Sequence, residues 1–348
     1  MEIVKELSEI AEKWTEPEYR ARPELSYSTI STYENLGFSG LEHLFDRKET
    51  PSLLLGSVVD TLTTGDEDEF NSLYSVLDIN ITDGGMNTVN QLLSMGLPFS
   101  SFSEIPEQIV SDAAKSVGFW QADKWDKKRY SEVLKTGNVA EYYDASLHSD
   151  KTIVSSETYQ TALAMVKALK ESPATAGYFA DNDELSPVRR YYQLKWKATI
   201  EDVGYRCMMD LAVVDYEKKI VYPVDLKTSS TPEWEFEKSF IKWHYLIQAV
   251  MYYNILKENL KKDEYFKDFA IADYKFIVVN PKTLTPLVWE FPLTKMRGPF
   301  IDADGTEWPD PFVVGEELQG YLNCKPPVPN GINQDGVNII NCLKVKEA

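Results

Sequence analysis

The sequence predicts a mixed α/β (α+β) protein, in which helices flank a central mixed sheet and a helical segment is inserted. Three observations lead to this fold class. Apolar and polar residues alternate in three segments between residues 187 and 230, and only short polar turns separate them, so an antiparallel meander is expected. Helical periodicity occurs on both sides of this block. Residues 66–186 have the pattern of helices and loops, without a metal or phosphate motif, and are predicted to form the insertion.

Three helices are expected before the insertion. Residues 1–14 have apolar side chains at helical spacing. A second helix is predicted to start at a cap provided by Ser26 or Ser28 and to stop near Gly37. A third covers residues 51–65, with a proline in its first turn and a glycine at its end. These elements give a first segment, 1–65, that belongs with the sheet.

The remaining elements lie in a third segment, residues 187–348. The meander strands are predicted over 187–200, 205–216 and 219–230, and Asp215 is expected to be a solvated turn residue. A helix with a 3.6-residue period follows, and then two strands, a late helix and an irregular tail. Their ranges are 243–262, 273–281, 287–293, 310–322 and 324–336.

The composition is that of a globular protein. The chain has 348 residues, of which 43% are apolar and 26% charged, which is enough for a buried core. No apolar run approaches the roughly 18 residues of a membrane helix, and the charged N-terminus differs from a secretory signal. Three cysteines are too few and too scattered for a disulfide framework or a metal cluster: Cys207, Cys324 and Cys342. We expect a cytoplasmic protein that does not bind membranes.

The formal net charge is −19. This charge argues against a protein that coats nucleic acid, because such proteins gain affinity by neutralising phosphates. It leaves room for an enzyme that contacts phosphates locally through a few Lys and Arg side chains and a divalent metal. Solubility alone explains the acidic balance equally well.

The third predicted strand carries opposite charges on one face. Asp225 and Lys227 are two positions apart, so both side chains point to the same side of the sheet. Counting back from the turn at 217–219 places Asp210 opposite residue 225 or 226. Two neighbouring carboxylates repel each other unless a cation neutralises them, and oxygen ligands favour Mg²⁺ or Mn²⁺ over zinc. The alternative is a simple ion pair on an edge strand.

This arrangement resembles the PD-(D/E)XK nuclease superfamily. Its core motif matches Asp210 and the run Asp225-Leu226-Lys227. Tyr245 and Gln248 match the Y-x-x-Q element of the branch that contains RecE-like and RecB-like phage exonucleases. Asp60, four residues after Gly56, takes the place of a further metal ligand on an upstream helix. The resemblance covers residues of about 18–65 and 187–292 and implies a restriction-endonuclease-like core.

The resemblance also implies an activity, a Mg²⁺- or Mn²⁺-dependent deoxyribonuclease that leaves a 5′-phosphate and a 3′-hydroxyl. Asp60, Asp210, Asp225 and the Leu226 carbonyl would hold the metal. Lys227 would position the attacking water, while Gln248 and Tyr245 would complete the pocket. Exonuclease action on DNA ends in phage recombination or genome processing is expected, with an endonuclease as the alternative. A single-strand annealing or recombination protein is a further expected partner, and a phage protein would act in the host cytoplasm.

The chain departs from the resemblance in two places. Residue 60 is Asp where many relatives have His, which predicts a site that favours Mg²⁺ more strongly. The four cysteines of the iron–sulfur relatives are absent from the sequence, so no iron–sulfur cluster is expected.

Several residues are candidates for contact with DNA. Ser26 and Ser28, at a helix start, could receive a terminal phosphate, as the resemblance implies, although a simple helix cap is equally plausible. Arg189, Arg190 and Lys242 could contact the DNA backbone. Tyrosines could stack on unpaired bases or belong to the core: Tyr27, Tyr33, Tyr252 and Tyr253.

Two other classes of function remain open at this point. The chain could be a non-catalytic DNA-binding or protein-interaction module that keeps the nuclease fold. It could also be an acidic scaffold in which Asp225 and Lys227 form only an ion pair. The polarity of cleavage, the preference for single or double strands and the oligomeric state are not encoded in any pattern we recognise.

Overall fold

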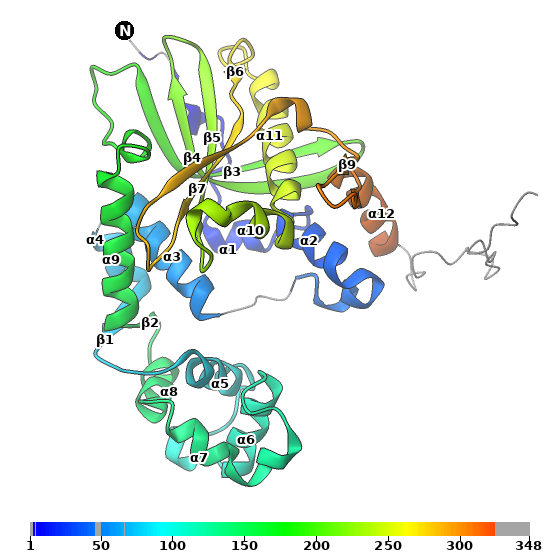
Figure 1. Cartoon of the computed structure of the whole chain (residues 1–348). Helices are drawn as coiled ribbons and strands as arrows, with labels where there is room; N and C mark the ends of the chain where they lie inside the picture. Colours follow the sequence, from blue (N-terminus) through cyan, green and yellow to red (C-terminus); the bar gives the residue numbers. More distant parts are fainter. Residues whose placement is uncertain (1–2, 4, 46–49, 66, 324–348) are drawn as a thin grey trace, which may run out of the picture.

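A computed structural model describes residues 3, 5–45, 50–65 and 67–323. Its centre is a six-stranded mixed sheet, which confirms the predicted fold class (Figure 1). Five strands follow one another in the spatial order β3-β4-β5-β7-β8, and β6 also pairs with β5. Their bounds are β3 Val188–Ile200, β4 Val203–Asp215, β5 Ile220–Thr228, β6 Ala270–Ile271, β7 Tyr274–Val279 and β8 Leu287–Phe291. Strands β5 and β7 are parallel, and the meander β3–β4–β5 is antiparallel, as predicted.

Tight turns fix the register of the meander. Between β3 and β4 the two turn residues Glu201 and Asp202 both have positive φ, the conformation of a two-residue hairpin turn that matches the strand twist. The turn from β4 to β5 is held by Asp215, whose carboxylate accepts a hydrogen bond from Lys218 N at 2.9 Å. Asp215 is only 6% exposed, so the expectation of a solvated turn residue is wrong. Its capping role, which depends on the folded turn, explains the burial.

Helices cover both faces of the sheet (Figure 1). On one face α11 (Tyr245–Lys262), α2 (Tyr27–Leu36) and α12 (Pro311–Asn323) pack on residues such as Ala212 and Val214 of β4. On the other, α3 (Pro51–Thr64) and α9 (Ser156–Glu171) pack on Leu211 and Val213. The alternation of β4 thus contributes to two separate cores.

Caps place the helix starts that later matter for the site. Ser26 accepts a hydrogen bond from Thr29 N, so α2 begins where the sequence predicts, and Gly37 ends it with a φ of 58°. Thr50 caps α3 in the same way, and a proline occupies its first turn. Local sequence therefore fixes the position of α3 along the chain to within one residue.

The helix predicted over residues 1–14 is wrong for the residues that the structure describes there. They contain only the 3₁₀ turn η1 (Leu7–Glu9), and the chain then continues extended, with Glu12 N bonded to Lys195 O of β3 at 2.9 Å. Leu7 is fully buried against the sheet. Pairing with the edge strand β3 satisfies the backbone groups that a helix would have paired internally.

The inserted segment contains a separate helical unit. Its elements are α4 (Glu67–Leu73), β1 (Tyr74–Leu77), α5 (Asp83–Ser94), α6 (Glu107–Ser116), α7 (Asp126–Leu134), α8 (Val139–Leu147) and β2 (Thr152–Ser155). Helices α5–α8 enclose their own core, which includes Val89, Val110 and Tyr143, and Figure 1 shows them gathered at one end of the molecule. The parallel pair β1–β2 joins this unit to α4 and α9, which pack with the sheet core.

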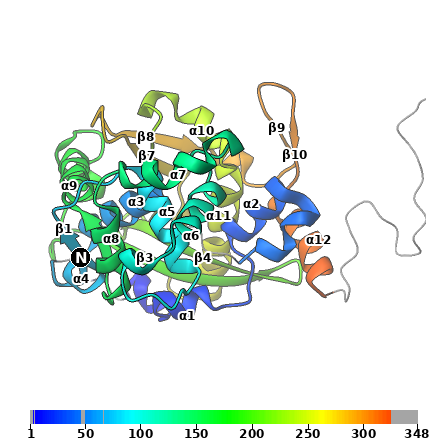
Figure 2. The same cartoon turned by 90° about the horizontal axis from the view of Figure 1, so that it is seen from below.

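The last described part of the chain closes the α11 side. A small hairpin, β9 (Phe300–Ile301) and β10 (Glu307–Trp308), lies near α12 in Figure 1 and projects from the body in Figure 2. Helix α12 follows it, as predicted, whereas the tail predicted to be irregular lies outside the described residues. None of the described helices is long and apolar enough to cross a membrane.

A buried carboxylate ties the connection after β5 to the sheet. Glu233, in the short turn η6 (Glu233–Glu235), is fully buried. It accepts hydrogen bonds from the backbone N–H groups of Asn280 and Thr285, both at 3.0 Å, and from the Thr283 hydroxyl. Burial works to raise the pKa of Glu233, but these donors outweigh it and lower the pKa below its usual value.

We expect Glu233→Gln to lower the free energy of unfolding by about 1–3 kcal/mol at pH 7, because a charge-assisted acceptor of three donors is lost. A lowered folded-state pKa means that the stabilisation is present above the unfolded-state pKa and disappears as the pH falls through the folded value. Urea titrations at pH 7 and near pH 3.5 should therefore show a difference that shrinks in acid. Exposed Glu237→Gln is the control, and a pH-independent difference would contradict this account.

Candidate active site

The centre of the candidate site lies on β5. Asp225 and Lys227 point to the α11 side of the sheet, whereas Val224 and Leu226 belong to the core on the α3 side, as the alternation predicts. Asp225 is 1% exposed. Lys227 Nζ lies 2.7 Å from Asp225 Oδ2, an ion-pair distance, although the approach lacks hydrogen-bond geometry. The ammonium thus neutralises the carboxylate without using the hydrogen-bonding capacity of Oδ2.

Asp210 approaches from the neighbouring strand. Leu211 of β4 pairs with Val224, so one step further along this register Asp210 faces Asp225, as predicted from the turn. Asp210 Oδ2 accepts a hydrogen bond from Leu226 N at 3.0 Å. Met209 and Ala212 both belong to the α11-side core although they are three positions apart, so the side-chain alternation of β4 changes phase at this point.

Asp60 comes from α3, across the end of β5. A Cβ atom at Gly56, one helical turn earlier, would lie 3.2 Å from the Thr228 hydroxyl oxygen, so the glycine allows a close approach of α3 to β5. Asp60 Oδ2 accepts a hydrogen bond from the side-chain amide of Gln193 in β3. Carboxylates from α3, β4 and β5 are therefore the three acidic groups of the candidate site.

Helix α11 adds an amide and an aromatic ring. Gln248 is buried, and its Nε2 donates to Asp225 Oδ1. Tyr245, one turn earlier, lies under the ammonium of Lys227, with Nζ 4.5 Å from the ring centroid. The Tyr245 ring also stacks on Phe236 and Phe276 at centroid distances of 5.7 and 5.9 Å, which holds it in place. Both residues of the Y-x-x-Q element thus contact the charged pair.

The charges of these residues perturb one another. Burial and the negative charge of Asp225 raise the pKa of Asp60 to about 7. Burial, Asp225 and Asp60 together raise the pKa of Asp210 well above its ordinary value. Burial works to lower the pKa of Lys227, but Asp225 and the other nearby acidic groups outweigh it and raise that pKa. If all three carboxylates were ionised, their charge would exceed what the one ammonium balances.

The donor atoms suit a hard cation, although they are not gathered around one point. Within the described residues, no three His, Cys, Asp or Glu side chains lie close enough together to hold a metal ion as they stand. Three buried oxygens nevertheless lack a hydrogen-bond donor: Asp60 Oδ1, Asp225 Oδ2 and Gln248 Oε1. Buried carboxylate oxygens without donors are costly, and a divalent cation with oxygen ligands would relieve that cost.

The predicted DNA-contact residues fall into two groups. Ser26 and exposed Ser28 are joined by a hydrogen bond of 2.9 Å at the start of α2, and Lys242 is exposed at the end of α10 (Phe236–Lys242). Arg189 and Arg190 lie at the start of β3, where their guanidinium groups donate to backbone carbonyls of residues 177–188. These arginines brace a loop, and DNA would compete with those bonds.

The expected roles of the tyrosines also separate. Tyr33 and Tyr252 are buried in the core, which is the predicted alternative to stacking on bases. Tyr252 lies edge-on to Tyr274. Tyr27 is partly exposed, and its ring centroid lies 6.3 Å from that of Tyr245. Tyr27 therefore contacts the site through Tyr245.

Sequence patterns did not indicate Gln193. It lies within β3, opposite Asp210, between the pairs Tyr192–Leu211 and Leu194–Met209. Its φ is 52°, a left-handed conformation that is strained for a side chain other than glycine. The strain directs its amide toward Asp60, and strained residues of this kind gather at functional sites. No local motif encodes this, because a glutamine in an alternating strand is unremarkable.

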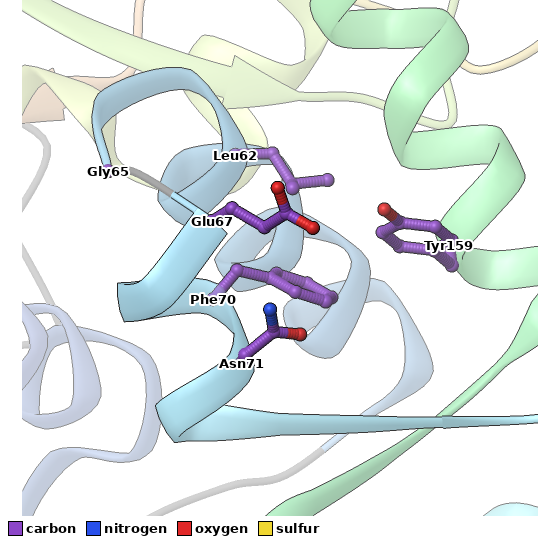
Figure 3. A pocket seen from close by; sticks show the side chains of 6 residues that line it. All are labelled: Leu62, Gly65, Glu67, Phe70, Asn71 and Tyr159. Atoms are coloured by element: carbon purple, nitrogen blue, oxygen red, sulfur yellow. The ribbon is translucent and has the colours of Figure 1, made fainter.

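A hollow of about 330 Å³ lies between the end of α3, α4 and α9 (Figure 3). It is lined by Leu62, Gly65, Glu67, Phe70, Asn71 and Tyr159. Residues 60 and 62 are two positions apart on a helix and therefore point in nearly opposite directions. The hollow is separate from the carboxylate cluster.

Comparisons with known proteins give little further information. No protein-family model matches the chain, and no curated protein matches it. One similar solved structure is a protein from Eubacterium rectale described as a "putative exonuclease". The identity is 13%, the match covers 82% of this chain and 80% of the other, and the TM-score is 0.42. A similarity this low supports no inference about activity, which must come from the residues themselves.

The strain at Gln193 has a measurable consequence. We expect Gln193→Gly to be more stable than Gln193→Ala by about 1 kcal/mol, because only glycine adopts positive φ without steric cost. Chemical denaturation of the two variants measures the difference. The same pair of substitutions at Thr199, an exposed residue of regular β3 structure, should give the opposite order. If the alanine variant is more stable than the glycine variant at both positions, Gln193 is not held in the left-handed conformation.

Proposed function

We propose that this protein is a metal-dependent deoxyribonuclease that hydrolyses phosphodiester bonds, acting as an exonuclease on DNA ends. The observation that carries the proposal is the cluster of Asp60, Asp210 and Asp225 around Lys227, at the position where three segments of the chain meet. A protein without chemistry gains nothing from burying mutually repelling carboxylates, since each costs desolvation energy. Roles in phage recombination or genome processing extend this proposal and follow from the family resemblance alone.

Asp60, Asp210 and Asp225, with the Leu226 carbonyl, would hold Mg²⁺ or Mn²⁺. Bound there, the ion would polarise a phosphoryl oxygen and lower the pKa of a water molecule. The oxygens of Asp60 and Asp225 that lack donors support this assignment. Lys227 now neutralises Asp225, so its ammonium would be released toward the water and the phosphate when the cation takes over the carboxylate.

The residues around the scissile bond have separable tasks. The water oxygen would attack phosphorus and lose a proton to solvent, and the bond from phosphorus to the 3′ oxygen would break as that oxygen takes up a proton from solvent, which leaves a 5′-phosphate and a 3′-hydroxyl. The Lys227 ammonium would stabilise the negative charge that develops on the phosphoryl oxygens. Tyr245 fixes the position of that ammonium, and Gln248 fixes Asp225. Ser26, Ser28 and Lys242 would contact the DNA backbone, and Arg189 and Arg190 would do so only after releasing loop carbonyls.

Incubation of end-labelled linear DNA with Mg²⁺ or with EDTA tests this activity directly. We expect cleavage in Mg²⁺ alone, and a loss of about 100-fold or more in Lys227→Ala, because charge stabilisation in the transition state is removed. Lys262→Ala, at the exposed end of α11, is the matched control and should cleave normally. Circular DNA in a parallel reaction separates exonuclease from endonuclease action.

Mn²⁺ titration by calorimetry tests the assigned ligands independently of cleavage. Asp225→Asn should weaken Mn²⁺ binding by about 10-fold or more, whereas Lys227→Ala should retain it. Asp202→Asn, in an exposed turn, controls for the loss of one charge. An Mn²⁺ affinity that is the same in the wild type and in Asp225→Asn would contradict the assignment of Asp225 as a metal ligand.

A non-catalytic DNA-binding module is the second candidate. One observation favours it: Lys227 and Gln248 already satisfy much of the charge of Asp225 without a metal. DNA binding without cleavage in Mg²⁺ or Mn²⁺, together with intact folding, would select this alternative.

The helical unit α5–α8 is proposed to act as a lid or channel wall. Replacing residues 78–151 with a short Gly/Ser linker should leave Mn²⁺ binding unchanged, since the unit has its own core, which α3 contacts at Leu54, and supplies none of the proposed ligands. The substrate range or the processivity on long DNA should change. Loss of Mn²⁺ binding in a folded deletion variant would contradict this division of labour.

A further inference from the structure

Large apolar side chains are exposed along one short stretch beside the site. Trp234, Ile241 and Trp243 are 57%, 40% and 51% exposed, and all lie within ten residues of η6 and α10. Single exposed apolar residues are common on protein surfaces, but several on one element mark a binding surface. Two of the three are tryptophans, which combine a large flat face with a polar edge.

The backbone that carries these residues is firmly anchored. Phe236, at the start of α10, is buried and packs on Tyr245, Phe276 and Trp289. Glu233 just before it is tied to residues 280–285 by the hydrogen bonds described above. The exposed rings are therefore presented by a rigid support, and their exposure is not the result of a loose loop.

Trp243 is directly connected to the residues around Lys227. Its carbonyl accepts a hydrogen bond from the Tyr27 hydroxyl at 2.6 Å. The Tyr27 ring adjoins Tyr245, over which the Lys227 ammonium lies. The backbone of Trp243 is thus linked to the proposed catalytic lysine through Tyr27 and Tyr245.

A positive charge accompanies the indole. Lys242 Nζ lies 4.7 Å from the centroid of the Trp243 ring, and the side chain is exposed. An aromatic face beside an ammonium is complementary to a nucleotide, whose base stacks and whose phosphate needs a cation. The chain has a net charge of −19, so most of its surface repels anions. A lysine next to an exposed indole is a better place for an anionic ligand to bind than the acidic surface elsewhere.

We propose that Trp243 and Lys242 form a nucleobase subsite, in which the indole stacks on one unpaired base and the ammonium contacts the adjacent phosphate. This inference rests on the proposed function and specifies its substrate: a single strand, or a duplex end with an unpaired base next to the bond that is cut. Trp243 is a positioning residue. It holds the strand so that the following phosphate reaches Lys227.

Binding measured without cleavage tests this subsite. Fluorescence anisotropy in EDTA at low salt compares a labelled oligothymidylate with an abasic strand of the same length, which keeps the phosphates and lacks the bases. Trp243→Ala should weaken binding of oligothymidylate by about 5- to 100-fold, with Trp243→Phe retaining part of it. Binding of the abasic strand should stay within about twofold. Lys242→Ala should weaken binding of both strands and reduce the dependence on salt.

Trp234→Ala is the matched control, because this residue is equally exposed but lies at the opposite end of α10. Its effect on oligothymidylate should stay within about twofold. An equal loss for both strands in Trp243→Ala, no loss for either, or a wild-type protein without preference for bases would overturn the subsite.

The two proposals fail separately. If Trp243→Ala leaves binding unchanged while Lys227→Ala abolishes cleavage, the subsite is wrong and the nuclease assignment stands. If Trp243→Ala loses base-dependent binding but the wild-type protein cleaves no DNA, the subsite stands as part of a binding module.

Discussion

The buried carboxylate of Asp225 is the constraint on which the site depends. A charge with 1% exposure in the middle of a sheet must be compensated, and Lys227, two residues along the strand, and Gln248 on α11 supply the compensation. Both partners approach from the α11 side. The parallel crossover from β5 through α11 to β7 is what brings that helix across the face of the strand.

The other two carboxylates, Asp60 and Asp210, are held by irregular backbone features that lower local stability. Asp210 and Gln193 lie where β4 and β3 depart from regular alternation, and Gln193 adopts a left-handed conformation to reach Asp60. A sheet built only for stability would place apolar residues here and avoid the strain. The cost in strain and in charge repulsion is concentrated at one place, which is the pattern expected where a fold has been adapted to bind and react.

Local signals predicted much of the fold, and the failures have physical reasons. The caps and apolar faces of α2, α3 and α11 are encoded within each segment, and turn counting placed Asp210 opposite Asp225. The first residues were expected to be helical because their period is helical, but pairing with the edge of β3 prevailed. The phase change at Gln193 and the exposed Trp243 depend on tertiary contacts, which a single sequence does not reveal. Arg189 and Arg190 appeared free in the sequence because no pattern shows that the preceding segment folds back and presents the carbonyls of Ser186 and Gly177 to them.

The central claim is that Asp60, Asp210 and Asp225 share one cation. A crystal structure of the protein grown with Mn²⁺, with diffraction measured near the manganese absorption edge, tests it most directly. We predict an anomalous peak between the three carboxylates at about 2.0–2.4 Å from their oxygens, with Lys227 displaced from Asp225. A structure in which saturating Mn²⁺ leaves the Lys227–Asp225 ion pair intact and no peak near Asp60 would contradict the account.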